Sequence, residues 1–185
     1  SSGNLNLIGD SALVILNSGV LSVEGEQIKN NSLISVTHQG TLKLNNLEVS
    51  GTGKINLQNN ATLTSSSSTN SVVTLKNQTI QTWDNASIQN IDLDFSQGST
   101  LHSAGGALNI TKANLSGDGN TVLSTSAGGS MAFNSTTLDS VVLNGEFYVG
   151  DKTNRVCVSG DAESGCYLVQ DINNVTWKAG SSGVL

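Results

Sequence analysis

The chain has 185 residues, of which 36% are hydrophobic, 4% aromatic and 12% charged, and its formal net charge is −6 at pH 7. Its eight Lys and Arg residues are scattered along the chain. This argues against binding to nucleic acid or insertion at an anionic membrane, because both need clustered basic residues. No apolar run approaches the about 20 residues that cross a bilayer, and residues 1–20 lack the basic flank and apolar block of a signal peptide.

The first third of the chain predicts a series of short β-strands. Alternating apolar residues indicate a strand with one buried face, because side chains i and i+2 project to the same side. Five such segments follow one another at intervals of about eight residues, as in solenoid repeats. They are Leu5–Gly9, Ala12–Leu16, Val20–Val23, Leu33–Val36 and Thr41–Leu44. The residues between them are mostly Asn, Gly, Ser and Asp, which favour turns.

These strands are too short to fold alone, since even a two-stranded hairpin is marginally stable in water. Between Gln39 and Thr64 the apolar residues come in alternating pairs, which are Leu42/Leu44, Leu47/Val49, Ile55/Leu57 and Ala61/Leu63. Neighbouring pairs must therefore share their burial. This predicts an all-β fold, a parallel β-solenoid or β-helix with three strands per coil of about 20–24 residues. The chain would form about eight coils, a rod of roughly 40 Å at about 4.8 Å per coil.

The same pattern continues through the rest of the chain. Residues 65–71, SSSSTNS, interrupt it and predict a loop at a coil corner. The apolar alternation resumes at Val72 and continues to Leu143. The chain has no proline, which would remove a hydrogen-bond donor from a strand paired on both sides. We interpret residues 1–185 as a single β-helix, and as a piece of a longer polypeptide because it begins without Met and ends within the pattern.

Residues 147–177 form an aromatic-rich portion that also contains both cysteines. Arg155–Val158 and Cys166–Val169 flank the sequence Ser-Gly-Asp-Ala-Glu-Ser-Gly and predict a β-hairpin that extends from the β-helix. Cys157 and Cys166 would face each other across it. This favours a disulfide in a chain of secreted character, and two buried free thiols are the alternative.

The aromatic residues near this hairpin are candidate contact residues. Tyr148, Tyr167 and Trp177 lie beside or within it and would protrude with it. Aromatic side chains are enriched where proteins contact their partners. Alternatively, they cap the open end of the apolar core.

Asp92 and Asp94 are further candidates for contact with a ligand. They would share one outward face of the strand Ile91–Phe95, whose apolar residues point inward. Paired carboxylates perform glycoside hydrolysis. A solvated polar face explains them better, because no third acidic residue and no basic partner is near in sequence. Gly117-Asp118-Gly119 is an isolated acidic turn rather than a repeated calcium-binding nonapeptide, so we expect no metal and no cofactor.

Several features of the chain occur together in one known class of proteins. They are short L-x-L strands closed by N-N, S-G and G-T turns, no proline, few aromatic residues, an excess of acidic residues and one closely spaced cysteine pair. In these features the chain resembles the passenger domains of bacterial type V autotransporters, most closely the adhesin and self-associating (AIDA-like) branch. The resemblance implies a right-handed parallel β-helix and export through the periplasm to the cell surface. The exoproteins of two-partner secretion share the same style and are a close rival.

We therefore expect a fragment of a surface-displayed bacterial adhesin, not an enzyme. It would mediate cell aggregation, biofilm formation or host attachment through ladders of Asn, Ser and Thr along the rod. The partner would be a second copy, or a glycan or protein of the host or matrix. Such ladders contain few long side chains, so little rotamer entropy is lost on docking. The alternatives are a polysaccharide-cleaving β-helix enzyme centred on Asp92 and Asp94, and a purely structural stalk.

Overall fold

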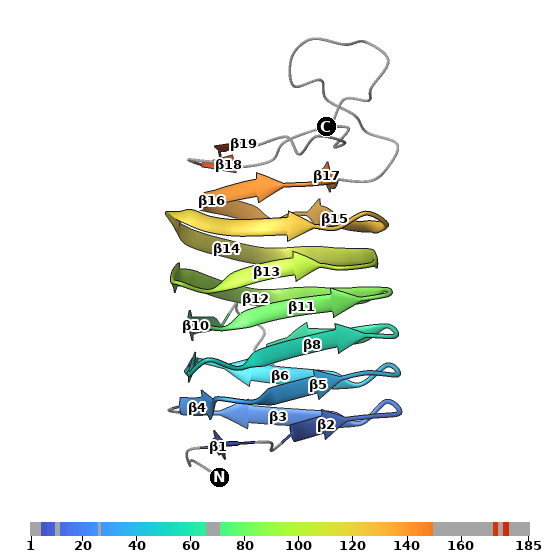
Figure 1. Ribbon diagram of the computed structural model, residues 1–185, viewed down its shortest axis with the longest axis vertical. Coiled ribbons are helices and arrows are strands. Elements are labelled where there is room, and N and C mark those ends of the chain that lie inside the picture. The colour runs from blue at the N-terminus through green and yellow to red at the C-terminus, as the bar shows by residue number, and fades with distance from the viewer. Residues whose placement is uncertain are drawn as a thin grey trace.

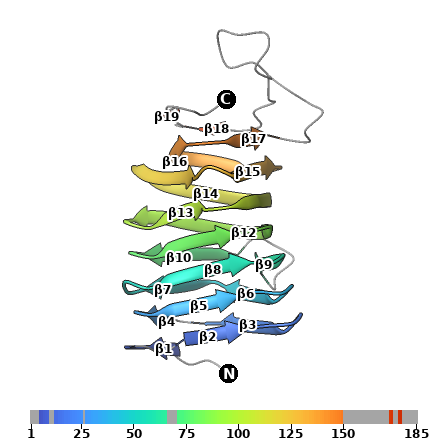
Figure 2. The ribbon, with the colours of Figure 1, turned by 45° about the vertical axis from the view of Figure 1, so that its right-hand side comes forward.

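The strands wind into one parallel stack. The computed structural model describes residues 5–9, 12–25, 27–65, 71–149, 172–173 and 176–177. The regular elements of these residues are all strands, with no helix among them, as predicted. The strands belong to a single sheet and pair in parallel with strands of the turns above and below, which makes a β-solenoid (Figure 1). The turns lie one upon another along the long axis (Figure 2).

Three strands in each turn give the solenoid three faces. Face one contains β1 (Leu5–Leu7), β4 (Gln27–Asn30), β7 (Leu47–Ser50), β10 (Val72–Lys76) and β18 (Ile172–Asn173). Face two contains β2 (Ala12–Ile15), β5 (Leu33–Val36), β8 (Lys54–Gln58), β11 (Thr79–Trp83), β13 (Thr100–Ser103) and β19 (Thr176–Trp177). Face three contains β3 (Val20–Glu24), β6 (Thr41–Asn45), β9 (Ala61–Thr64), β15 (Gly129–Asn134) and β17 (Phe147–Val149). We call the corner between faces one and two the first corner, and that between faces two and three the second corner.

Three longer strands continue around corners, which the sequence analysis did not predict. They are β12 (Ala86–Gln97), β14 (Gly106–Thr125) and β16 (Thr137–Asn144). The pairing partners of these strands show their course. Strand β12 passes from face three to face one, β14 crosses all three faces, and β16 passes from face one to face two. Single residues in the left-handed region make bends inside all three, Asn90 (φ 53°) in β12, Lys112 (φ 51°) in β14 and Ser140 (φ 55°) in β16. The strands flanking such a bend stay paired, so no break separates them.

The number of turns was predicted wrongly. We expected about eight coils from repeats of about 20–24 residues, and the structure has about six turns. Two pairings explain part of the difference. Lys54 pairs with Thr79 across residues 66–70, and Leu138 pairs with Ile172 across residues 150–171. These intervals are longer than one regular repeat, so dividing the chain length by the repeat overestimates the number of turns.

The core consists of apolar ladders, one residue from each successive strand of a face. Leu44 and Leu57 are fully buried, as the alternation predicted, and Lys43 between Leu42 and Leu44 is partly exposed. The central ladder of face two is Leu13, Ile34, Ile55, Ile80, Leu101, Leu123 and Leu143. Strand β4 was missed in the sequence because Ile28 is its only apolar residue; it pairs with Leu5 and Val49 and is buried.

Side-chain volumes compensate each other across the second corner. On face two, the inward residues next to this corner change from large to small along the rod: Ile15, Val36, Leu57, Thr82 and Ser103. On face three, their counterparts change from small to large: Gly40, Ala61, Ala86, Leu108 and Met131. A Cβ on Gly40 would lie 3.2 Å from the Ile15 Cγ2. The opposing trends help to keep the core filled, because interiors pack as densely as organic crystals.

The C-terminal predictions fall outside the described part of the chain. The hairpin segments Arg155–Val158 and Cys166–Val169 are not among the described residues, which include neither Cys157 nor Cys166, and no disulfide is found in them. At either side of this segment, β17, β18 and β19 continue the parallel stack on β15 and β16.

Candidate functional site

Asp92 and Asp94 lie on face one, in the part of β12 that pairs with β10 and β14. Both are partly exposed and Leu93 between them is buried, as the alternation predicted. The Asp92 Oδ1 accepts hydrogen bonds from the Nδ2 of Asn114 at 2.7 Å and from its backbone N at 3.2 Å. The Asp94 Oδ1 accepts one from the backbone N of Ser96 at 2.9 Å. Both carboxylates are thus held in place by neighbouring donors.

The residues beside these carboxylates are neutral. In the ladder Asp92 pairs with Val72 and Asn114, and Asp94 pairs with Thr74 and Ser116. Glycoside hydrolysis needs one carboxyl group as general acid and a second as base or nucleophile on the two sides of the scissile bond. A pair on one flat strand with neutral neighbours is better suited to contact than to such a mechanism.

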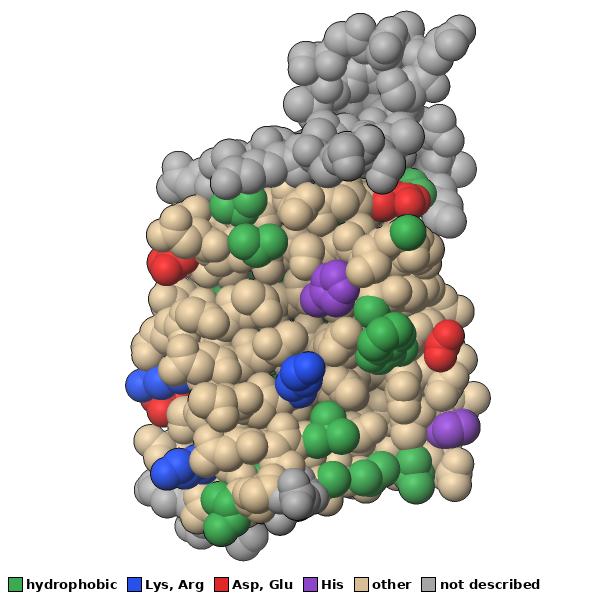
Figure 3. Space-filling model, viewed as in Figure 1, with side chains coloured by type: hydrophobic (Ala, Val, Ile, Leu, Met, Phe, Trp, Pro, Cys, Tyr) green, Lys and Arg blue, Asp and Glu red, His purple; other side chains and the backbone are tan. Residues whose placement is uncertain are grey.

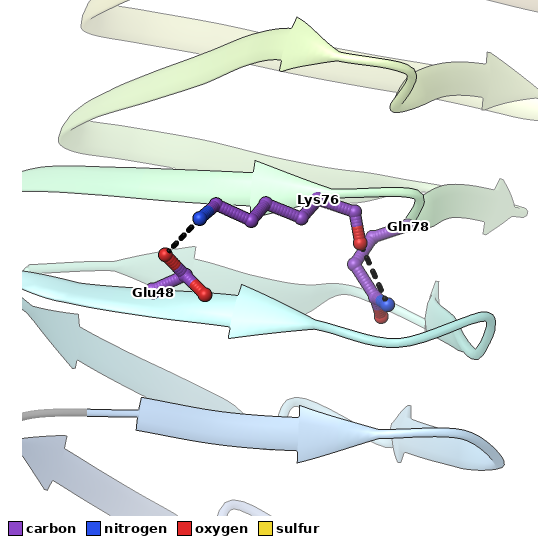
Figure 4. A network of polar contacts seen from close by, with 3 residues as sticks. All are labelled: Glu48, Lys76 and Gln78. Carbon is purple, nitrogen blue, oxygen red and sulfur yellow. Dashed lines mark hydrogen bonds and ion pairs between the residues drawn. The ribbon is translucent and has the colours of Figure 1, made fainter.

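The charges on face one differ between the two ends of the rod. Lys29 in β4 and Lys76 in β10 lie toward the N-terminal end, and the Lys76 Nζ forms an ion pair of 2.6 Å with the Glu48 Oε2 (Figure 4). Asp92, Asp94 and Asp139 follow toward the C-terminal end. Face one therefore changes from mixed charge to negative charge along its length.

Charged side chains are sparse on face two, where most side chains are polar and uncharged (Figure 3). His102 in β13 bonds two serines there, with 2.8 Å between its Nδ1 and the Ser124 Oγ and 3.0 Å between its Nε2 and the Ser126 Oγ. A catalytic triad would place a carboxylate on one ring nitrogen. With a hydroxyl on each nitrogen, this group is a polar surface ladder. The spacing of 22 residues between His102 and Ser124 was its signal in the sequence.

The predicted contact residues that the structure describes lie on different faces. Asp92 and Asp94 are on face one. Tyr148, in β17 on face three, donates its hydroxyl hydrogen to the Oε1 of Glu146. Trp177, in β19, pairs through its backbone with Leu143 on face two. Tyr167 lies outside the described residues.

A groove that the sequence analysis missed lies at the second corner. Two side chains from each of three successive turns line about 440 Å³: Asn17, Ser18, His38, Gln39, Asn59 and Asn60. The connections that follow β2, β5 and β8 stack at this edge of the rod (Figure 1). All six residues have left-handed backbone, with φ from 51° to 65°. The signal in the sequence was a pair of polar residues repeating at the turn spacing, as between Ser18 and Gln39, 21 residues apart.

Few of the polar atoms in the groove are used within the protein. The Thr37 Oγ1 bonds the His38 Nδ1 at 3.0 Å and the Asn59 Nδ2 at 3.2 Å, and the Ser18 Oγ lies 3.4 Å from the Gln39 Oε1. Within the described part of the chain, the carboxamides of Asn17 and Asn60 and the Nε2 atoms of His38 and Gln39 make no hydrogen bond. Donors and acceptors thus remain available along the groove.

Two further features are absent from the described residues, a metal-binding cluster and a membrane-spanning helix. No three His, Cys, Asp or Glu side chains lie together there as a metal site would need. Nor do these residues include a helix long and apolar enough to cross a membrane. In comparison with known proteins, the chain matches no family model, no curated protein and no solved structure. The surfaces of the solenoid are therefore the basis for a functional proposal.

Proposed function

We propose that the chain is part of a surface-displayed bacterial adhesin whose rod associates with a second copy through face one, as in cell aggregation or biofilm formation. The observation that supports this is the order of charges on face one, from Lys29 and Lys76 to Asp92, Asp94 and Asp139. The resemblance to autotransporter passenger domains supplies the remaining parts of the proposal. These are the right-handed winding and the location at the cell surface.

Two copies that lie antiparallel, face one against face one, bring opposite charges together. With a two-fold axis between β10 and β12, Lys76 of one copy lies opposite Asp92 and Asp94 of the other, and Lys29 lies opposite Asp139. The symmetry makes each contact occur twice. In a parallel arrangement, Asp92 and Asp94 would meet the same carboxylates of the second copy, which like-charge repulsion disfavours.

A single pair of rods would bind weakly. About six turns at about 4.8 Å, and about five residues across at about 3.3 Å, make a face of roughly 30 by 15 Å. Two such faces bury about 900 Å² in total, less than the about 1,200–2,000 Å² of stable complexes. Exposed ion pairs add only about 0–1 kcal/mol each. Association between cells would therefore depend on many displayed copies, because avidity multiplies weak contacts.

The charge order can be tested with latex beads coated with the chain. Lys29→Asp and Asp139→Lys should each reduce clustering of the beads. The chain with both changes should recover it, because the two charges are exchanged across the two-fold axis. Lys54→Asp, an exposed change on face two, is the matched control and should leave clustering unchanged.

Four results would contradict the proposal. Clustering that neither single change reduces, or that the double change does not restore, would reject face one as the contact surface. A chain that never clusters would favour the structural stalk. The proposal includes no catalysis, so release of reducing ends from a polysaccharide, abolished by Asp92→Asn, would favour the enzyme instead.

A further inference from the structure

We propose that the groove at the second corner binds a neutral oligosaccharide. It lies on a different edge of the rod from face one, so this site does not depend on the proposed self-association. Three features of the groove favour such a ligand: the conformation of the lining residues, the chemistry of their free atoms and the position of one exposed tryptophan.

The lining residues keep side chains where glycine would be less strained. The left-handed conformation costs a residue with a Cβ roughly 1–2 kcal/mol, and only Gly, Asn and Asp adopt it routinely. Further along the rod the same corner uses Gly106 (φ 66°) and Gly128 (φ 84°). In the groove, Ser18 and Gln39 adopt it instead, with φ of 63° and 65°. The groove therefore presents polar side chains at a corner that further along the rod uses glycine.

Half of the backbone N–H groups that line this corner are already bonded between turns. The backbone N of Ser18 donates to the His38 oxygen at 3.0 Å, that of Gln39 to the Asn59 oxygen at 2.9 Å, and that of Asn60 to the next turn. A peptide that adds a strand needs an uninterrupted row of free backbone groups at a sheet edge, which these bonds interrupt. Recognition would therefore depend mainly on the side chains.

The free side-chain atoms fit the hydroxyl groups of a sugar. Carboxamides and hydroxyls both donate and accept hydrogen bonds, as sugar hydroxyls do. No Lys, Arg, Asp or Glu lines the groove, so it has no fixed charge with which to select an ionic ligand. The lining pairs repeat once per turn, at about 4.8 Å, which is comparable with the rise per residue of an extended polysaccharide. A linear glycan along the corner would therefore meet similar groups at successive residues.

Trp83 supplies an apolar surface beside this ladder. The residue is 45% exposed, and its backbone pairs with Gln58, the residue before Asn59. An exposed indole carries an apolar face and one N–H donor. A sugar ring, which has an apolar C–H face and polar edges, complements both.

The test uses two neutral tetrasaccharides, cellotetraose and chitotetraose, in calorimetric titrations. The groove variant carries Ser18→Gly, Gln39→Gly and Asn60→Gly, which remove side chains and relieve the left-handed backbone. The matched control carries Asn77→Gly, Lys112→Gly and Ser140→Gly, three left-handed positions with φ of 51° to 55° at other corners. At least one sugar should bind the original chain and the control alike. The groove variant should bind it about tenfold or more weakly, a change of about 1.4 kcal/mol.

Several results would overturn the proposal. They are no binding of either sugar at millimolar concentration, equal affinity of the groove variant, or tighter binding of a sulfated tetrasaccharide than of both neutral ones. Trp83→Ala should weaken binding as well. Unchanged affinity of this variant would show that the indole is not part of the site. If the groove variant loses its β circular dichroism, Gln39→Gly alone, against Asn77→Gly, makes the same comparison. Lys29→Asp should leave sugar binding unchanged, which separates this result from that for face one.

Discussion

The side chains of Asn30 and Gln78 hydrogen-bond to each other inside the first corner, although 48 residues separate them. The Asn30 Nδ2 lies 2.9 Å from the Gln78 Oε1, and the Gln78 Nε2 lies 3.3 Å from the Asn30 carbonyl oxygen. Both residues are buried. Gly53 lies between them, and a Cβ there would be 2.6 Å from the Asn30 Nδ2. The missing side chain at Gly53 lets Asn30 and Gln78 meet.

This pair should contribute to stability as a unit. Gln78→Ala and Asn30→Ala should each lower the free energy of unfolding by about 1–3 kcal/mol, because each leaves a buried partner unsatisfied. The double variant should lose less than the sum of the two, as expected for residues in contact. Urea unfolding followed by circular dichroism measures all three. Strict additivity would show that the two side chains do not interact. Gly53→Ala should also destabilise the protein, because its Cβ would displace Asn30.

Two buried hydroxyls should be replaceable with a gain in stability. The Thr82 Oγ1 and the Ser103 Oγ are buried without a hydrogen-bond partner in the described chain, on paired positions of β11 and β13. An unsatisfied buried polar group costs about 1–3 kcal/mol. Thr82→Val and Ser103→Ala should therefore raise the midpoint of thermal unfolding. Ser87→Ala, on the outer side of β12, is the control and should have little effect. A lower midpoint for Thr82→Val would mean that its hydroxyl has a partner.

Neighbouring residues of β6 should differ sharply in their tolerance of substitution. Leu44 is fully buried in the core, so Leu44→Ala should cost about 2–5 kcal/mol. Lys43 points outward and is partly exposed, so Lys43→Ala should change stability by less than about 0.5 kcal/mol. Denaturant midpoints for the two variants make the comparison. Equal losses would contradict the assignment of inward and outward faces.

The Asp118 carboxylate should keep stabilising its corner of the solenoid at a lower pH than an ordinary aspartate would. Its pKa is held below the usual range by a hydrogen bond from the backbone N of Asn120 at 2.9 Å, with further bonds from Thr121, which together outweigh the opposing effect of desolvation. Since the folded pKa is depressed, the stabilisation is complete above the unfolded pKa of about 3.9 and is lost as pH falls through the lower folded value. A carbon-13 titration of the Asp118 carboxyl group should show this midpoint. Asp118→Asn should abolish the pH dependence of the neighbouring amide signals, and a normal midpoint would contradict the geometry.

The cysteine pair remains a prediction that can be tested directly. If Cys157 and Cys166 form a disulfide, the unreduced chain unfolded in denaturant should not react with a thiol reagent. The loop of about ten residues would contribute up to roughly 3 kcal/mol. Cys157→Ser with Cys166→Ser should then increase proteolysis near the C-terminus and leave Leu5 to Ile110 protected, because each turn contacts only its neighbours. Two reactive thiols would show that the alternative of free cysteines is correct.

The sequence alone was sufficient to predict the parallel solenoid and its buried residues. The reason is that strand alternation is local. Leu42 and Leu44 must point to one side of their strand whatever lies beside them, and such short strands can bury that side only by stacking. The same reasoning placed Asp92 and Asp94 on an outer face. It failed for β4, where Ile28 is a single apolar residue and the strand forms because it pairs between β1 and β7.

Only the tertiary structure decided which residues of different turns meet. That depends on the number of residues in each turn, and this number changes where residues 66–70 lengthen one interval. The groove from Asn17 to Asn60, the bond between Asn30 and Gln78 and the order of charges on face one all depend on this register. A longer interval changes which residues lie opposite each other across that one turn, while the local pattern stays the same. Apolar alternation determines that turns stack, whereas the contacts between turns follow from the length of each one.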